Sequence, residues 1–157
     1  MGNANVDNPS STGKKQVPIK EDFFATPLSP PDQVRLRGSK CRACGTVILG
    51  KSVACQNCGS QDIEKIVLSR RGKIYSYTII RYPPLPPYAG PEPFQPFAIA
   101  WVELPEGVRI LSPLVGCKID ESETDLKVDM NVELTVDKVC DDEEGNELMT
   151  YKFRIIR

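Results

Sequence analysis

The chain has 157 residues, of which 40% are hydrophobic, and its formal net charge is −1. This length corresponds to one domain or two small ones. It contains no histidine, the commonest general base and catalytic metal ligand, which weighs against independent catalysis. No apolar run is long enough to span a membrane and the first 20 residues are polar, so we expect a cytoplasmic protein.

The small net charge hides a strong asymmetry along the chain. Residues 33–73 carry nine Lys and Arg residues against two acidic ones, a balance of +7. Residues 74–157 carry eight basic residues against fifteen acidic ones, a balance of −7. We therefore expect one end of the molecule to attract phosphate groups and the other to repel them.

The first 32 residues read as an extended arm. Residues 1–16 are rich in Asn, Ser, Gly and Lys, and the sequence predicts disorder there. Residues 17–32 contain Phe23 and Phe24 among four prolines, which exclude a long helix. Such a segment lies along a surface, either that of its own domain or that of a partner chain.

Residues 33–67 contain the most specific motif. Two CxxC pairs, each followed by a glycine, begin at Cys41 and Cys55. Two residues between cysteines let a tight turn aim both sulfurs at one ion, and a glycine permits positive φ. The spacing predicts a rubredoxin-like zinc ribbon; a pair of disulfides and a single rubredoxin-type iron are the alternatives. The ribbon strands are expected at residues 34–37, 47–49 and 63–68.

The metal is expected to stabilise the fold without taking part in chemistry. Its predicted ligands are Cys41, Cys44, Cys55 and Cys58. Because four thiolates fill a tetrahedral site, no position remains for an activated water. A Cys₄ zinc centre adds a charge of about −2, which lowers the balance of the basic segment to about +5.

Residues 68–157 read as an all-β domain. Five segments read as strands, of which residues 73–82 are rich in β-branched and aromatic residues and residues 132–139 alternate cleanly, and no amphipathic helix separates them. The pattern predicts a small, partly open, five-stranded OB-fold barrel, although an SH3-like barrel gives a similar pattern. The five strands are expected at residues 73–82, 97–104, 108–116, 132–139 and 148–156.

The connection at residues 83–96 is unusual, because seven of its fourteen residues are proline. Such a loop is stiff and extended, and costs little entropy to order. It presents Leu85, Tyr88 and Phe94. It either packs on its own barrel as a connector or forms a docking edge for another protein or an acyl ligand.

A zinc ribbon followed by an OB-fold first suggests nucleic-acid binding. An oligonucleotide groove requires a positive track and stacking aromatic side chains. The barrel has a balance of −7, and the aromatic residues of its first strand alternate as core residues do. We therefore expect no nucleic-acid partner, and a nucleic-acid-binding module remains an alternative.

This layout resembles the acyl-CoA-associated OB-fold family that carries a rubredoxin-like zinc ribbon. The resemblance covers roughly residues 33–157 and depends on the combined order of the motifs. These motifs are the four ribbon cysteines, residues 71–78, the proline-rich loop, residues 96–104, residues 106–107 and residues 116–117. One departure is Asp129 before Met130, where the family usually has glycine, so we expect a different turn there.

The resemblance implies a non-catalytic accessory subunit beside a thiolase-fold partner, with two copies of each chain. The partner would supply the nucleophilic cysteine and the general base, and would cleave a 3-oxoacyl-CoA by thiolysis. One candidate substrate is 2-benzoylsuccinyl-CoA of anaerobic toluene degradation. A thiolase-fold aldolase or a hydroxymethylglutaryl-CoA synthase is the alternative partner. This chain would contribute structural zinc and part of the CoA tunnel.

The basic segment suggests which residues of this chain would contact CoA. Arginine binds phosphate groups in a bidentate manner, and CoA carries a diphosphate and a ribose phosphate. We expect the mouth of the tunnel to be lined by Arg70, Arg71, Lys73, Arg42 and Lys51. A solvated basic face, or ion pairs with the partner, is the alternative.

Overall fold

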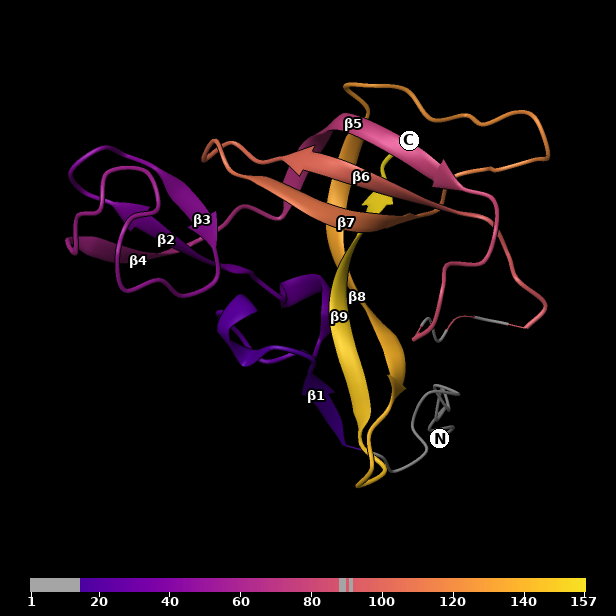
Figure 1. The fold of residues 1–157 in the computed structure, drawn as a ribbon, viewed down its shortest axis with the longest axis horizontal. Coiled ribbons are helices and arrows are strands. Elements are labelled where there is room, and N and C mark those ends of the chain that lie inside the picture. The colour runs from indigo at the N-terminus through magenta and orange to yellow at the C-terminus, as the bar shows by residue number, and fades with distance from the viewer. Residues whose placement is uncertain (1–14, 88–89, 91) are drawn as a thin grey trace, which may run out of the picture.

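The fold consists of two β-sheets joined by a short linker (Figure 1). The computed structural model describes residues 15–87, 90 and 92–157. Within these residues the only helical elements are two 3₁₀ turns, η1 (Glu21–Phe23) and η2 (Pro31–Gln33). The mainly β prediction is confirmed. Disorder was predicted for residues 1–16, of which 1–14 lie outside the described residues, while Gln16 belongs to strand β1 (Gln16–Pro18).

The larger sheet closes into a five-stranded barrel. Four neighbouring pairs follow the order β9-β7-β6-β5-β8, and β8 also pairs with β9. Only β7 and β9 run parallel within this closed cycle. This is the topology of an OB-fold, so that prediction is confirmed, and the barrel is closed rather than partly open. The strands are β5 (Arg71–Ile80), β6 (Phe97–Glu103), β7 (Arg109–Val115), β8 (Asn131–Asp141) and β9 (Glu147–Ile155).

Alternation along the strands fills the barrel interior. Ile74, Val102 and Phe153 are completely buried, and Leu134 and Ile110 are nearly so. Their neighbours along each strand point to the outer face, as the period of two requires. The inward-facing side chains of the strands therefore form one continuous core inside the barrel.

The smaller sheet is the ribbon, with strand order β3-β2-β4. Its strands are β2 (Arg37–Cys41), β3 (Val47–Leu49) and β4 (Ile63–Val67). The first ribbon strand was expected at residues 34–37 and instead runs directly into the first knuckle. The reason is that Val34 and Leu36 are fully buried in the barrel core rather than in the ribbon sheet.

Polar contacts fix the linker between ribbon and barrel. The backbone N–H of Leu68 donates to the carbonyl oxygen of Leu36 at 2.9 Å, and the Leu68 side chain is fully buried. The backbone N–H and the hydroxyl of Ser69 both donate to Oε1 of Glu106, each at 2.7 Å. Because Glu106 belongs to the turn between β6 and β7, this carboxylate ties the linker to the barrel.

The described part of the arm lies against its own chain. Strand β1 (Gln16–Pro18) pairs in parallel with β9 and adds a sixth strand outside the barrel cycle. The rings of Phe23 and Tyr151 meet edge to face, with centroids 5.8 Å apart. Phe24 forms an isolated β-bridge with Leu36. Of the two surfaces considered for the arm, residues 15–32 thus contact their own domain.

Two connections stand out from the barrel. The far ends of β8 and β9 extend beyond it, and β1 pairs with this end of β9 (Figure 1). In the proline-rich loop Leu85 is 87% exposed, while Phe94 packs edge to face on Phe97. Tyr88 lies outside the described residues. The turn before β8 contains Asp129 at φ 68°, a conformation that favours glycine, so the departure from the family pattern keeps a left-handed residue there.

Candidate functional site

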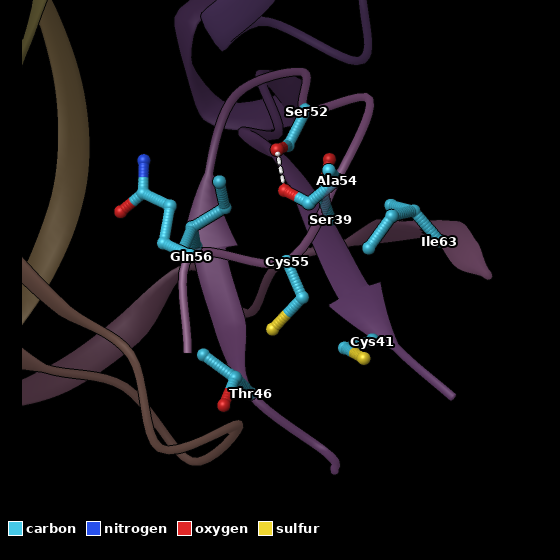
Figure 2. A pocket seen from close by; sticks show the side chains of 9 residues that line it. Ser39, Cys41, Thr46, Ser52, Ala54, Cys55, Gln56 and Ile63 are labelled. Carbon is cyan, nitrogen blue, oxygen red and sulfur yellow. Dashed lines mark hydrogen bonds between the residues drawn. The ribbon is translucent and has the colours of Figure 1, made fainter. Parts of the chain in front are cut away.

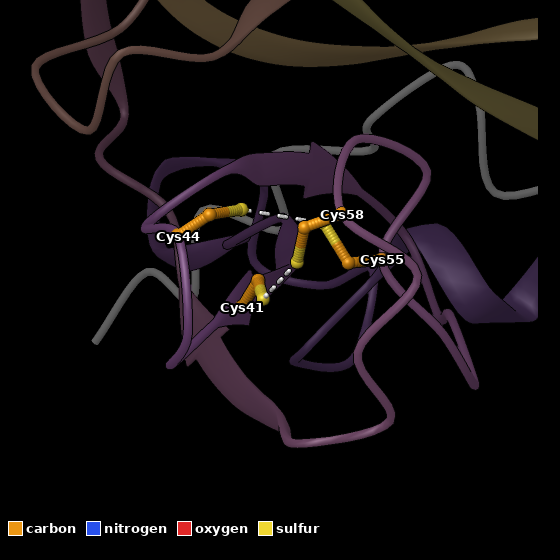
Figure 3. Close-up of side chains that lie close together, drawn as sticks. All are labelled: Cys41, Cys44, Cys55 and Cys58. Carbon is orange, nitrogen blue, oxygen red and sulfur yellow. Dashed lines mark hydrogen bonds between the residues drawn. The ribbon is translucent and has the colours of Figure 1, made fainter.

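Four sulfur atoms converge between the two knuckles of the ribbon (Figure 3). All four Sγ atoms lie within 4.8 Å of one another. The Sγ atoms of Cys41 and Cys58 are 3.6 Å apart, and those of Cys44 and Cys55 are 3.5 Å apart. A disulfide requires about 2.05 Å, whereas tetrahedral zinc with bonds of about 2.3 Å places its sulfurs about 3.8 Å apart. The spacing fits a shared metal ion and excludes the disulfide alternative.

The two knuckles use the same backbone hydrogen bonds. In the first, the N–H of Gly45 donates to the carbonyl oxygen of Cys41 at 2.8 Å, and the second repeats this from Gly59 to Cys55 at 2.9 Å. Both glycines have positive φ, 80° and 75°, as the sequence predicted. Each turn therefore aims its first sulfur inward by local geometry alone.

Neighbouring groups shift the pKa values of Cys44 and Cys58 in opposite directions. Hydrogen bonds from Thr46, its side chain first, lower the pKa of Cys44 to about 5. The backbone N–H of Ser60 acts in the same direction on Cys58, yet contacts with Cys41 and the other sulfurs raise the pKa of Cys58 to about 12. Four thiolates this close cannot all ionise without a cation, which a divalent metal would supply.

The ribbon interior beside the sulfurs is small. Figure 2 shows Cys41 and Cys55 on one side of a hollow between the ribbon strands, with Thr46 beside them. On the other side the hydroxyl of Ser52 donates to the carbonyl oxygen of Ala54 at 2.6 Å. The ribbon side chains close this space around the metal position, so zinc here would have a structural role.

The five basic residues expected to contact CoA lie in different environments. Arg70 is only 13% exposed, and its guanidinium donates to the carbonyl oxygens of Pro31, Val34 and Leu134. These hydrogen bonds give Arg70 a structural role and argue against phosphate binding by this residue.

The two ribbon residues of that set also differ. Arg42 follows the first zinc ligand, and its guanidinium contacts Asp62 at 3.1 Å and Glu64 at 3.5 Å. This pairing raises the pKa of Arg42, mainly through the hydrogen bond to Asp62. Lys51 is exposed just beyond β3. Neither residue lies on the barrel strand that carries Arg71.

Arg71 and Lys73 share the outer face of β5. Together with Asn131 they line a shallow hollow of about 290 Å³ at the ribbon end of the barrel. Arg71 contacts Glu133 of β8, which also contacts Arg154 of β9. Sequence reasoning missed Arg154, because it is 83 positions from Arg71 and only the strand register brings the two together. The one sequence feature that could have indicated Arg154 is its place between buried positions of the last predicted strand, which puts its side chain on the outer face.

The outer face of the barrel carries two exposed aromatic residues, one of them from the first strand, whose aromatic residues were expected to be in the core. Tyr77 does pack against the core, but Tyr75 is 49% exposed. Tyr75 points outward because it follows the fully buried Ile74, and the β-bulge between Ile74 and Ser76 then shifts the alternation so that Tyr77 packs against the core. Trp101 on neighbouring β6 is 44% exposed. One of the two arguments against nucleic-acid binding was therefore wrong for Tyr75.

Comparison with known proteins assigns both domains. Residues 29–64 match the rubredoxin-like zinc ribbon domain of ChsH2, and residues 66–137 match the ChsH2 C-terminal OB-fold domain. A DUF35 domain-containing scaffold protein of Pyrococcus furiosus is 36% identical over 126 residues, which are 80% of this chain and 86% of that protein. The chain belongs to the DUF35 zinc-ribbon and OB-fold family.

Two other similar proteins are named as parts of enzymes. The benzoylsuccinyl-CoA thiolase subunit BbsA of Thauera aromatica is 34% identical over 122 residues, 77% of this chain and 76% of that subunit. The solved Ltp2-ChsH2(DUF35) aldolase matches with a TM-score of 0.56 and 31% identity, covering 77% of this chain and 84% of the matched chain. Within the described residues, no helix is both long and apolar enough to cross a membrane.

Proposed function

We propose that this chain is a non-catalytic subunit of a complex that cleaves a carbon–carbon bond in a CoA thioester. The observation that carries the proposal is the pairing of a closed four-sulfur site with an OB-fold of the type found in BbsA and ChsH2. A thiolase-fold partner would perform the chemistry in the cytoplasm, with two copies of each chain. The zinc would stabilise the ribbon.

Thiolysis is the proposed reaction, because similarity extends over three quarters of a thiolase subunit. The partner's cysteine would attack the 3-oxo carbon and break the bond between C2 and C3, so that C2 takes up a proton and leaves as the first CoA thioester. The thiol of a second CoA would then attack the acyl-enzyme, which forms the second CoA thioester and frees the cysteine, so one CoA is consumed per bond cleaved. With 2-benzoylsuccinyl-CoA, the products would be benzoyl-CoA and succinyl-CoA. This chain would line part of the CoA tunnel with residues of its basic segment.

An aldolase complex is the second candidate, supported by the structural match to the Ltp2-ChsH2(DUF35) aldolase. Retro-aldol cleavage consumes no CoA and releases a ketone or aldehyde together with one thioester. The two reactions therefore differ in stoichiometry, which a product analysis measures directly.

The proposal is tested by purifying the natively expressed, tagged chain under mild conditions and identifying what accompanies it. The expected result is a thiolase-fold protein in a 1:1 ratio, and a complex that consumes one CoA per bond cleaved. Cleavage without CoA consumption would assign the aldolase instead. Purification with nucleic acid and without any protein would contradict both.

A further inference from the structure

A row of charges crosses three neighbouring strands on the outer face of the barrel. The register places Arg71 of β5 opposite Glu133 of β8, and Glu133 opposite Arg154 of β9. The carboxylate of Glu133 lies 3.8 Å from Arg71 and 3.9 Å from each of Arg154 and Arg70. Three guanidinium groups thus surround one carboxylate, which leaves an excess of two positive charges.

The arginines at the two ends of the row keep their donors available. Their nitrogen–oxygen distances to Glu133 exceed hydrogen-bond length, so these are loose ion pairs. Within the described residues, the side chains of Arg71 and Arg154 donate no hydrogen bond, and they are 73% and 57% exposed. Arg70 differs, because backbone carbonyls take its donors.

Two shallow hollows flank the row. One, of about 290 Å³, has Arg71 and Lys73 in its wall; the other, of about 320 Å³, has Arg154 and Glu133. Their remaining acidic groups do not cancel the positive charge. In the first hollow, Glu103 already pairs with Arg109 at 2.9 Å. In the second hollow, Asp32 is the acidic residue besides Glu133. Counted together, Arg70, Arg71, Lys73 and Arg154 exceed Glu133 and Asp32 by two charges.

We propose that Arg71, Arg154 and Lys73 form a clamp for the phosphate groups of a nucleotide. Two arginine forks on adjacent rigid strands suit bidentate phosphate binding, and a lysine beside them adds a point charge. Mutual repulsion of the cations is unfavourable in the free protein and is relieved when an anion enters. The nucleotide is identified as the phosphate-bearing end of CoA only through the function proposed above.

The test uses the zinc-loaded full chain and adenosine 3′,5′-bisphosphate as the probe, measured by calorimetry at low salt. Arg71→Gln and Arg154→Gln are each expected to weaken binding about tenfold, since each removes a charge-assisted contact. Lys65→Gln is the matched control, because Lys65 is an exposed cation on β4, away from the row. It should change affinity less than about twofold, as expected for a distant screened charge.

Glu133→Gln provides a sharper readout. Removal of the central carboxylate should strengthen probe binding about threefold or more, because the repulsion of the phosphates disappears. Glu121→Gln, an exposed acid on a loop, is its control and should change little. No detectable binding, equal binding by the Arg71 and Arg154 variants, or equal competition by an acidic peptide lacking phosphate would overturn the clamp.

The outcome is separable from that of the proposed function. If the free chain binds the probe but no thiolase-fold protein accompanies it from cells, the clamp is supported and the proposed complex is contradicted. If the complex cleaves its thioester and both arginine variants keep the apparent affinity for CoA unchanged, the clamp is contradicted and the proposed complex is supported.

Discussion

Arg70 and Leu134 exchange two hydrogen bonds. The backbone N–H of Leu134 donates to the carbonyl oxygen of Arg70 at 2.7 Å, and Nη2 of Arg70 donates to the carbonyl oxygen of Leu134 at 2.9 Å. A further donor of the same guanidinium reaches the carbonyl oxygen of Val34. One side chain therefore joins the ribbon lead-in, the linker and β8.

Replacement of Arg70 by glutamine is expected to lower the free energy of unfolding by about 2–3 kcal/mol. The change removes charge-assisted hydrogen bonds and leaves partly buried carbonyls without partners. Urea denaturation measures this loss. The adjacent, exposed Arg71→Gln is the control and should cost less than about 0.5 kcal/mol. Equal effects of the two substitutions would show that Arg70 is an ordinary surface residue.

Metal removal should unfold the ribbon and spare most of the barrel. The ribbon strands β2–β4 have few buried side chains of their own, because Leu36 and Leu68 belong to the barrel core. Hydrogen exchange after chelation is expected to lose protection at β2–β4 and retain it in β5–β9. Unchanged protection throughout would contradict a structural metal.

Metal content measures the same site in the folded protein. One zinc per chain is expected, and Cys44→Ser should lower the zinc content and lose the ribbon protection. Cys117→Ser is the matched control, because Cys117 is half-buried and outside the sulfur cluster. Iron in place of zinc would favour the rubredoxin-type alternative.

Replacement of Asp129 by glycine should stabilise the protein. The Asp129 φ of 68° is strained for any residue with a Cβ atom, although aspartate tolerates this region better than most. Asp129→Gly is expected to raise the free energy of unfolding by about 0.5 kcal/mol, whereas Asp129→Ala should lower it. A thermal melt of the two variants compares them. The opposite order would mean that the aspartate side chain has a role of its own.

Leu85 in the proline-rich loop should matter for assembly and not for folding. Its side chain is 87% exposed on a stiff loop, as expected for a docking edge. Leu85→Asp is expected to weaken the complex with the thiolase-fold partner at least tenfold, a typical loss for an interface anchor, while the melting temperature stays unchanged. Val53→Asp, at an 80% exposed ribbon position, is the control. Equal retention of the partner by both variants would make the loop a simple connector.

Local patterns predicted the metal site and the strands well, because these depend on few neighbouring residues. The CxxC spacing already indicated all four ligands, and segments that read as strands, bounded by turn residues, indicated the five barrel strands. Which of two adjacent charged residues is buried could not be predicted from such local patterns. Arg70 and Arg71 look alike in the sequence, and only contacts with Val34 and Leu134, 36 and 64 positions away, bury the first.

Two further features depended on the three-dimensional register. The bulge in β5 places Tyr75 on the outer face and Tyr77 against the core, although the two are only two positions apart, and no turn residue in the sequence marks it. Arg154 joined Arg71 only through the pairing of β5, β8 and β9. The proposed phosphate clamp thus combines Arg71 and Lys73, which the sequence indicated, with Arg154, which it did not.

The account depends on a division of labour between this chain and a catalytic partner. The most direct measurement is the rate of thioester cleavage by the purified chain, by the partner, and by their reconstituted complex, with the partner's nucleophilic cysteine intact or replaced by serine. We predict background rates for this chain alone and for the serine complex, and rapid CoA-dependent cleavage by the intact complex. Cleavage by this chain alone, at a rate comparable to that of the intact complex, would contradict the account.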